Sequence, residues 1–289
     1  MGTNHRTGPQ RIVCLTEETT ETLYLLGEDR RIAGISGFTY RPKEARRTKP
    51  RVSAFTSAKI DKILELRPDL VIGFSDLQAQ IAHDLIRSGV NVLVTNQRSV
   101  QEILDSILML ARIVARDATG IELVGRFERD LTRIKESALR FPQRPRVFFE
   151  EWMDPLISGI RWVEELVEIA GGEVIFPHLR NEYLAKGRIV DPTAVAAANP
   201  DVVIASWCGR KVSKEKIRAR EGWQSIQAVR AGHIYEIKST YILQPGPAAL
   251  TEGVRQLHAI LAHVAKSAPL DGLEPAESMD PDLTASQSV

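Results

Sequence analysis

The sequence predicts an α/β protein of two similar lobes, each built around a parallel sheet, joined by one long helix. Residues 60–74 (IDKILELRPDLVIGF) and 192–206 (PTAVAAANPDVVIAS) share one pattern: a short amphipathic helix, a Pro-Asp pair and an unbroken apolar run. Short Val-, Ile- and Leu-rich runs alternate with helical stretches, which is typical of parallel sheets covered on both faces. Between the repeats, apolar residues recur every three or four positions, which predicts a long helix. We therefore expect two Rossmann-like lobes with a ligand-binding cleft between them.

The first lobe is expected to span residues 10–117. Its first helix should end at Gly27, because glycine readily adopts the left-handed conformation that closes a helix. A later helix should end before Pro68, since the residue before a proline avoids helical angles. The loop over 38–50, rich in Arg, Lys and Pro, is predicted to be irregular. The predicted strands are 11–15, 31–35, 70–74 and 91–94, and the predicted helices are 17–27, 58–66, 78–88 and 100–115.

The connecting helix is expected within residues 118–142, and Phe141-Pro142 and Pro145 should end it. The second lobe is expected over 143–266. A tail over 267–289 is predicted to be disordered, because it is rich in Pro, Asp and Ser and shows no apolar period. The predicted strands of the second lobe are 146–150, 174–176, 202–205 and 233–237, and its predicted helices are 162–170, 193–198, 214–219, 223–229 and 248–265.

Charge and composition restrict the possible functions. A formal net charge of +1 does not favour nucleic-acid binding. No run approaches the ~18–20 apolar residues that span a bilayer. The opening MGTNHRTGPQ lacks the basic and apolar regions of a secretory leader, which predicts a cytoplasmic protein, or a periplasmic one if the sequence is trimmed. Cys14 and Cys208 are expected to be buried, reduced thiols, although a bridge between them is possible.

Aromatic residues gather in the segments that follow the predicted strands. Ligands of parallel α/β sheets bind at the carboxyl ends of the strands, so these segments are candidate binding loops. Only 6% of the residues are aromatic, and their concentration here favours a large flat ligand. The alternative is that about half of them simply fill the lobe cores. The aromatic residues in question are Phe38, Tyr40, Phe55, Phe74, Trp152, Trp162, Trp207 and Tyr241.

Signatures of catalysis and of metal binding are missing from the sequence. No nucleophile elbow, zinc-protease motif, Walker sequence or dinucleotide fingerprint follows a predicted strand. The six histidines are scattered, so neither a metal site nor a required cofactor is predicted. The one acidic cluster is Glu150, Glu151 and Asp154, which could bind a cation or orient a ligand amide. A solvated loop, or a helix cap supplied by Asp154, explains the cluster equally well.

The motifs resemble those of the helical-backbone class (class III) of ABC-transporter substrate-binding proteins, which handle cobalamin, siderophores and haem. Residues 150–172 (EEWMDPLISGIRWVEELVEIAGG) resemble the acidic-Trp-x-Asp-Pro loop, the Gly-x-Trp and the Ala-Gly-Gly helix end of the cobalamin-binding branch. The turn Trp207-Cys208-Gly209 also resembles that branch, and residues 22–36, 223–237 and 245–257 match the wider class. The resemblance covers about residues 10–266.

Two features depart from the family pattern. The resemblance implies an exported protein with a leader, which is not evident here. It also implies a surface glutamate on each lobe that seats in an arginine pocket of the membrane permease, and the matching positions are Asp61 and Thr193. Asp61 could still pair with arginine, whereas Thr193 carries no charge. This puts permease docking in doubt and favours a cytoplasmic relative that keeps the cleft.

Three functional hypotheses remain open. The first is a non-catalytic, monomeric binding protein for cobalamin or a related corrinoid, in which the proposed contacts are Tyr40, Phe55, Trp152, Asp154, Trp162, Trp207 and Tyr241. The second changes the ligand to haem or a ferric siderophore, with Arg41, Arg161 and Arg210 facing an acidic rim and with Tyr40, Tyr241 or Met153 as axial ligands. The third is a cytosolic partner-binding module or an enzyme, and the enzyme would use Glu151 and Asp154 as an acid/base pair.

Overall fold

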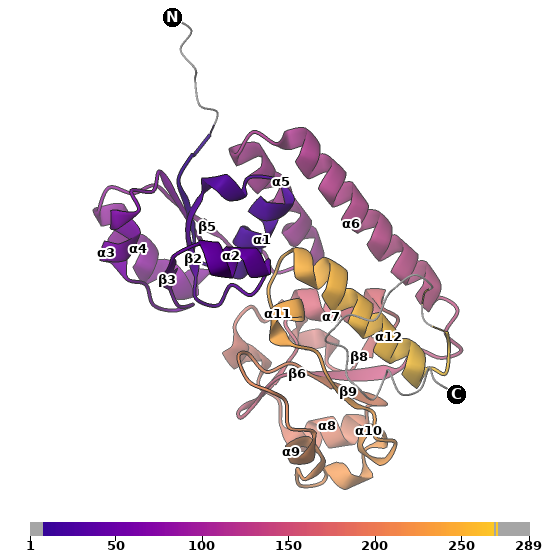
Figure 1. Cartoon of the computed structure of the whole chain (residues 1–289). Coiled ribbons are helices and arrows are strands. Elements are labelled where there is room, and N and C mark those ends of the chain that lie inside the picture. Colours follow the sequence, from indigo (N-terminus) through magenta and orange to yellow (C-terminus); the bar gives the residue numbers. More distant parts are fainter. Residues whose placement is uncertain (1–7, 269, 271–289) are drawn as a thin grey trace, which may run out of the picture. The chain divides into compact units, whose positions relative to one another are not determined.

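The computed structural model describes residues 8–268 and 270 of the chain (Figure 1). The contacts between its residues divide the chain into two compact units. The N-terminal unit comprises residues up to Gln97 together with Gln101–Arg126. The C-terminal unit comprises Arg98–Val100 and the residues from Phe127 onward. The predicted tail lies almost entirely outside the described residues.

The N-terminal unit is a five-stranded parallel sheet in the order β3-β2-β1-β4-β5. Because the order reverses beside the first strand, the switch point of this doubly wound sheet lies between β1 and β4. The side chains of β1 are wholly buried, as expected for the central strand of a sheet covered on both faces. The strands are β1 (Ile12–Cys14), β2 (Ile32–Ser36), β3 (Arg51–Ser53), β4 (Leu70–Phe74) and β5 (Val92–Thr95).

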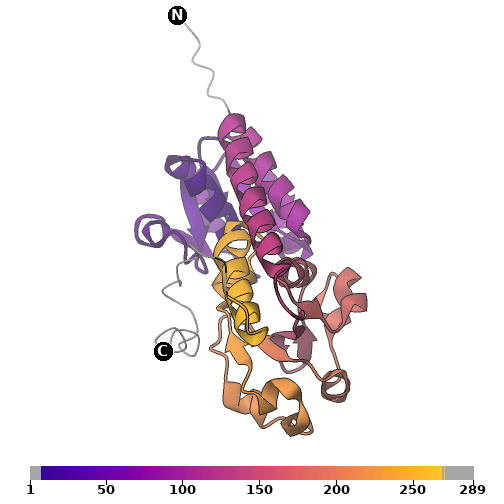
Figure 2. The same cartoon turned by 90° about the vertical axis from the view of Figure 1, so that its right-hand side faces the viewer.

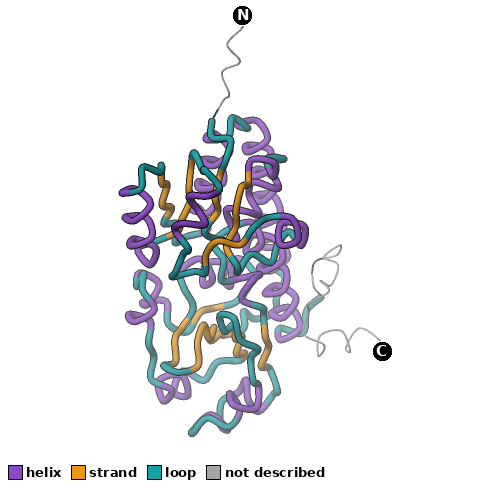
Figure 3. The backbone as a smooth tube through the Cα atoms, turned by 60° about the vertical axis from the view of Figure 1, so that its left-hand side comes forward, coloured by secondary structure: helices purple, strands orange, loops and turns teal. Residues whose placement is uncertain are grey.

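Helices flank the strands of this unit (Figure 3). They are α1 (Glu17–Leu25), α2 (Lys43–Thr48), α3 (Ile60–Glu65), α4 (Ala79–Arg87) and α5 (Val100–Ile113), with short 3₁₀ turns over Asp29–Arg31 and Asp76–Gln78. The predicted irregular loop over 38–50 is wrong in part, because it contains α2. A six-residue helix with a single buried side chain, Ala45, has too little apolar period to be recognised from sequence.

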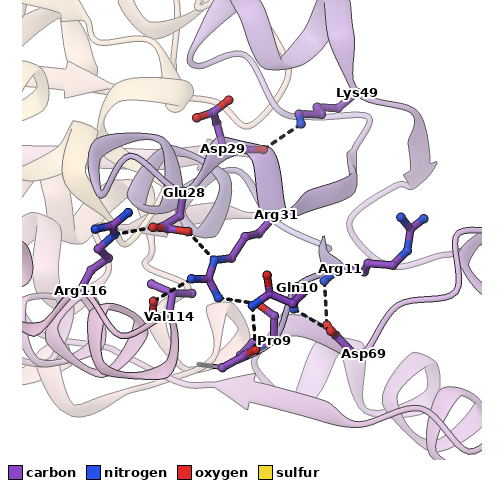
Figure 4. Close-up of polar contacts among 11 residues, drawn as sticks. Pro9, Gln10, Arg11, Glu28, Asp29, Arg31, Lys49, Asp69, Val114 and Arg116 are labelled. Atoms are coloured by element: carbon purple, nitrogen blue, oxygen red, sulfur yellow. Dashed lines mark hydrogen bonds and ion pairs between the residues drawn. The ribbon is translucent and has the colours of Figure 1, made fainter. Parts of the chain in front are cut away.

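A buried carboxylate ties the end of α1 to the turn before α6 (Asp117–Ala138) within the N-terminal unit. Glu28 is 5% exposed and bonds to the guanidinium groups of both Arg31 and Arg116 (Figure 4). Arg31 also donates to the carbonyl oxygens of Pro9 and Val114, at 2.9 and 3.2 Å. Burial opposes ionisation of Glu28, but the hydrogen bonds from the two arginines outweigh it and lower the pKa of this carboxyl. The cluster therefore contains an ionised, paired glutamate.

The C-terminal unit contains a mixed sheet in the order β10-β9-β6-β7, with β8 paired to the first residues of β6. All pairs are parallel except β6 and β7, which form an antiparallel hairpin. The α/β class with two lobes is confirmed, whereas the prediction that both sheets are purely parallel is wrong at this hairpin. The strands are β6 (Arg146–Met153), β7 (Leu156–Ser158), β8 (Glu173–Val174), β9 (Val202–Ala205) and β10 (Ile234–Glu236).

The bulky side chains Phe148 and Trp223 share one core of this unit with eleven other buried residues, and their rings meet edge to face with centroids 5.9 Å apart. The remaining helices of the unit surround its sheet. They are α7 (Arg161–Ile169), α8 (Pro192–Ala198), α9 (Lys214–Arg218), α10 (Gln227–Arg230), α11 (Ser239–Ile242) and α12 (Val254–Val264), with 3₁₀ turns over Pro177–Asn181, Ala185–Arg188 and Trp223–Ser225 and a π-helical turn over Ala249–Gly253.

The longest helix, α6, has 22 residues and belongs to both units (Figure 2). At ~1.5 Å per residue it is about 33 Å long. The apolar face predicted from the sequence is buried, including Val124, Phe127, Leu131 and Ile134. The helix ends at Ala138, a few residues before the predicted limit at 142. The division between the units falls inside it, between Arg126 and Phe127.

Candidate ligand-binding site

At the carboxyl edge of the N-terminal sheet, Glu17 holds the loop that follows β2. Its Oε1 accepts hydrogen bonds from the backbone N–H groups of Tyr40 and Arg41, at 3.0 and 2.8 Å. The guanidinium of Arg41 also lies 3.3 Å from Glu17 and 3.3 Å from Glu21. The loop thereby presents two aromatic rings to solvent, since Phe38 is 49% and Tyr40 is 44% exposed.

The first turn of α1 carries two buried acids whose pKa values are abnormal. Burial raises the pKa of Glu17 to about 7, although Arg41 and the two backbone N–H groups favour its ionised form. Burial likewise raises the pKa of Glu18 to about 7, although a hydrogen bond with the Thr16 side chain favours its ionised form. Both groups therefore change charge near neutral pH, directly after the central strand of the sheet.

On the other side of the switch point, Gln78 ties the end of β4 to the loop that carries Phe55. Its Oε1 accepts from the Phe74 N–H at 2.9 Å, and its Nε2 donates to the Phe55 carbonyl at 2.7 Å. Gly73 makes room for this side chain, because a Cβ there would lie 2.7 Å from Oε1 of Gln78. Ser75 follows with φ of 60° and ψ of 173°, a conformation that only glycine adopts without strain.

In the C-terminal unit, the first acidic residue of the predicted cluster is buried and neutralised. Glu150 is 0% exposed and accepts from both terminal nitrogens of Arg220, at 2.9 and 3.1 Å. It also accepts from the indole N–H of Trp207 at 3.1 Å. The Arg220 guanidinium lies 4.2 Å from the ring centroid of Trp223, so its planar face is covered as well. This group forms part of the interior and presents no free charge.

The second acidic residue is paired in the same way. Glu151 accepts from Arg188 at 2.6 and 3.0 Å, and the Arg188 side chain is 1% exposed. Arg188 also donates to the Ser158 carbonyl and so ties β6 and β7 to the segment before α8. Burial raises the pKa of nearby Glu164 to about 7, although the charges of Arg180 and Arg188 act to lower it. A carboxylate bound at both oxygens is a poor general base, which argues against the acid/base pair.

Trp152 is a half-buried aromatic side chain at this edge. It lies in β6, opposite Ile157 of β7, and its indole N–H donates to the Asp154 carbonyl at 2.9 Å. The guanidinium of Arg210 lies 5.5 Å from its ring centroid. Asp154 is exposed between the two strands of the hairpin, so of the two alternatives the solvated loop is confirmed and the helix cap is wrong.

The structure places the predicted contact residues in different environments. Tyr40 is exposed, and Phe55, Trp152 and Tyr241 are half-buried. Trp162 and Trp207 are each 3% exposed, and their indole N–H groups bond to the Ile242 carbonyl and to Glu150. These two tryptophans therefore face protein atoms. For them, the alternative that aromatic residues fill the lobe cores is correct.

Sequence reasoning missed Glu17, Gln78, Arg188 and Arg220, which position this set of residues. Only Glu17 carried a signal, since it follows a predicted strand directly. Gln78 was expected in a helix, and the two arginines lie 37 and 70 residues from the glutamates that they neutralise.

The two positions that match the family's docking glutamates are both exposed. Asp61 lies in the first turn of α3, and Thr193 lies in the first turn of α8. The N–H and the hydroxyl of Thr193 both donate to the Asp191 carboxylate, at 2.8 and 2.7 Å. These hydrogen bonds lower the pKa of Asp191, so a negative charge sits two residues from the neutral threonine.

The described residues contain no group of three or more His, Cys, Asp and Glu side chains placed to hold a metal ion. None of the described helices combines the length and the apolar character that crossing a bilayer requires. Both cysteines are free, Cys14 buried and Cys208 exposed, so the expectation that both are buried is wrong for Cys208.

Comparison with known proteins decides the family. Residues 12–241 match the periplasmic binding protein family. The chain belongs to this family. It is 26% identical over 86% of its length to an uncharacterised ABC transporter substrate-binding lipoprotein of Bacillus subtilis, 79% of which is covered. It is 25% identical over 83% of its length to a vitamin B12-binding protein of Vibrio parahaemolyticus, 86% of which is covered.

Solved structures confirm the fold. The periplasmic vitamin B12-binding protein of Vibrio cholerae matches with a TM-score of 0.69 at 22% identity, covering 90% of this chain and 99% of that one. A periplasmic haem-binding protein of Roseiflexus matches with a TM-score of 0.76 at 21% identity, covering 89% and 100%. The chain is thus a solute-binding protein of the helical-backbone class, whose members bind solutes without catalysing reactions.

These findings overturn the predicted cytoplasmic location. The family is periplasmic, and the Bacillus subtilis relative is a lipoprotein, so the relatives point outside the cytoplasm. The cytoplasmic prediction depended on two local features, the lack of a leader pattern in the first residues and the uncharged Thr193 at a docking position. Such local patterns are weaker evidence than a family match that extends over residues 12–241.

Proposed function

We propose that this solute-binding protein binds cobalamin or a related corrinoid outside the cytoplasm, without chemical conversion. The observation that carries the proposal is the exposure of apolar and aromatic side chains at the carboxyl edge of the N-terminal sheet. Phe38, Tyr40 and Leu77 are 49%, 44% and 53% exposed, although large apolar side chains are usually buried. The similarity to vitamin B12-binding proteins over most of the chain supports the choice of ligand.

The proposed contacts are the accessible aromatic members of the predicted set, namely Tyr40 and Phe55 of the N-terminal unit and Trp152 and Tyr241 of the C-terminal unit. Glu17 and Gln78 hold the loops that carry Tyr40 and Phe55, so these rings lose little freedom when a ligand packs on them. Trp152 is held by its bond to the Asp154 carbonyl. Loops that are already ordered within each unit suit recognition of a rigid macrocycle.

Equilibrium titration tests the proposal. Cyanocobalamin and dicyanocobinamide are added to the purified full chain, and tryptophan quenching and calorimetry follow binding. Saturable binding of one ligand molecule per chain at micromolar concentration is the expected result. A chain that binds neither compound at 100-fold higher concentration would contradict the proposal.

A second candidate ligand is haem, and the exposure of Tyr40 favours it. A solvent-accessible phenol is a competent axial ligand for ferric iron. Titration with hemin distinguishes the two ligands, because a tyrosine-bound haem shows a shifted Soret band that Tyr40→Phe would abolish. Tyr241 and Met153 are both half-buried, and Tyr241→Phe provides the comparison variant.

A further inference from the structure

The side chain of Arg210 differs from the other arginines at the carboxyl edges of the sheets. Arg41, Arg188 and Arg220 each pair with one or two glutamates. Arg210 is exposed, and among the described residues its guanidinium makes neither a hydrogen bond nor an ion pair. All of its N–H donors are therefore available to a molecule that approaches from solvent.

Trp152 positions the Arg210 guanidinium. The ring of Trp152 packs against the core of the C-terminal unit, and its N–H is bound to the Asp154 carbonyl. The Arg210 guanidinium lies over this ring at 5.5 Å, within the range of a cation–π contact. The backbone of Arg210 is also held, because its N–H donates to the Trp207 carbonyl at 3.1 Å. An arginine stacked on an aromatic face keeps its hydrogen-bonding edge open.

The pairing of the neighbouring charges determines what Arg210 can attract. Glu150 and Glu151 are neutralised by Arg220 and Arg188, so neither competes strongly for the Arg210 guanidinium. Lys211, the next residue, is exposed and adds a second positive charge. An oxyanion gains a bidentate, charge-assisted contact at such a position.

We propose that Arg210, stacked on Trp152, binds an acidic oxygen group of the ligand and thereby determines which members of the ligand class are held. This inference rests on the proposed function and adds the chemistry of one recognised group. The group is a phosphodiester if the ligand is a complete corrinoid, or a carboxylate if the ligand is haem. Both present paired oxygens to a planar fork of N–H donors.

Matched ligand pairs test the proposal with the full chain. Cyanocobalamin carries a phosphodiester that dicyanocobinamide lacks, and hemin carries two carboxylates that its dimethyl ester lacks. For the pair that the wild type binds, we expect Arg210→Gln to weaken binding of the compound that carries the acidic group about tenfold. The affinity for the compound that lacks this group should change less than twofold. Arg210→Lys should fall between, since it keeps the charge but loses the fork.

Arg230→Gln is the matched control, because Arg230 is an exposed arginine at the end of α10, next to the amino end of β10. It should leave all four affinities unchanged. Equal weakening of both members of a pair by Arg210→Gln, or no weakening, would overturn the role of Arg210 while leaving the proposed function intact. A wild type that binds none of the four compounds would reject the proposed function itself, and this inference with it.

Discussion

Both terminal N–H groups of Arg220 donate hydrogen bonds to the carboxylate of Glu150, which is completely buried within β6. The same carboxylate accepts from the indole of Trp207. The pair therefore stabilises the inward orientation of a tryptophan that the sequence had suggested for the ligand. It also removes two charges from the edge where the ligand is proposed to bind.

Breaking this pair should be costly. Arg220→Met leaves the buried Glu150 carboxylate unpaired, and we expect a loss of about 3–5 kcal/mol in the free energy of unfolding. Glu150→Gln combined with Arg220→Met should recover part of this loss, because an amide carries no charge. Urea denaturation followed by tryptophan fluorescence measures both. Arg133→Ala breaks the exposed pair with Asp130, at 3.9 Å, and should cost less than about 1 kcal/mol.

Glu18 should make stability depend on pH. Burial raises the pKa of its carboxyl from 4.5 to about 7, so the protonated side chain is the form that the fold favours. Its contribution to the free energy of unfolding is therefore fully present below pH 4.5 and is lost as the pH rises through 7. Glu18→Gln removes the cost of ionising a buried group. We expect the variant to have a higher melting temperature than the wild type at pH 8 and a nearly equal one at pH 5. Exposed Glu122→Gln is the control, and an equal effect of Glu18→Gln at both pH values would contradict the prediction.

The conformation of Ser75 should be strained. Ser75→Gly and Ser75→Ala both remove the hydroxyl that accepts from the Leu77 N–H at 3.3 Å, and they differ only in backbone freedom at φ of 60°. Glycine should therefore be more stable than alanine by about 1–3 kcal/mol. Urea denaturation of the two variants gives this difference directly. A more stable alanine variant would show that the conformation is not strained.

The two thiols should react differently with iodoacetamide. Burial raises the pKa of Cys14 to about 12, and its side chain is inaccessible in the folded protein. Cys208 is exposed, although partial burial and the charge of Glu151 raise the pKa of its thiol and slow its reaction. Mass spectrometry of the native protein should find the label on Cys208 alone, and Cys208→Ser should abolish it. Labelling of Cys14 before unfolding would refute the assignment.

Local patterns predicted those elements that are determined by nearby residues. The apolar run after each Pro-Asp pair forms a strand, β4 or β9, and the three-and-four spacing forms α6. The hairpin of β6 and β7 was not predicted, because its register depends on pairing across the turn at Asp154. The orientation of Trp162 was not predictable either, since the Ile242 carbonyl that accepts from it lies 80 residues away. Residue types at strand ends thus indicate a binding edge, but distant partners decide which side chains remain accessible.

The helix α6 has a consequence for how the chain can be divided. The boundary between Arg126 and Phe127 lies within a continuous ladder of backbone hydrogen bonds rather than in a loop. Proteases cut extended, unpaired segments, so limited digestion should not separate the halves at this point. A gene fragment that stops at residue 126 would end in mid-helix and leave the last carbonyl groups without their donors. Producing either half alone therefore requires carrying the whole of α6 with it.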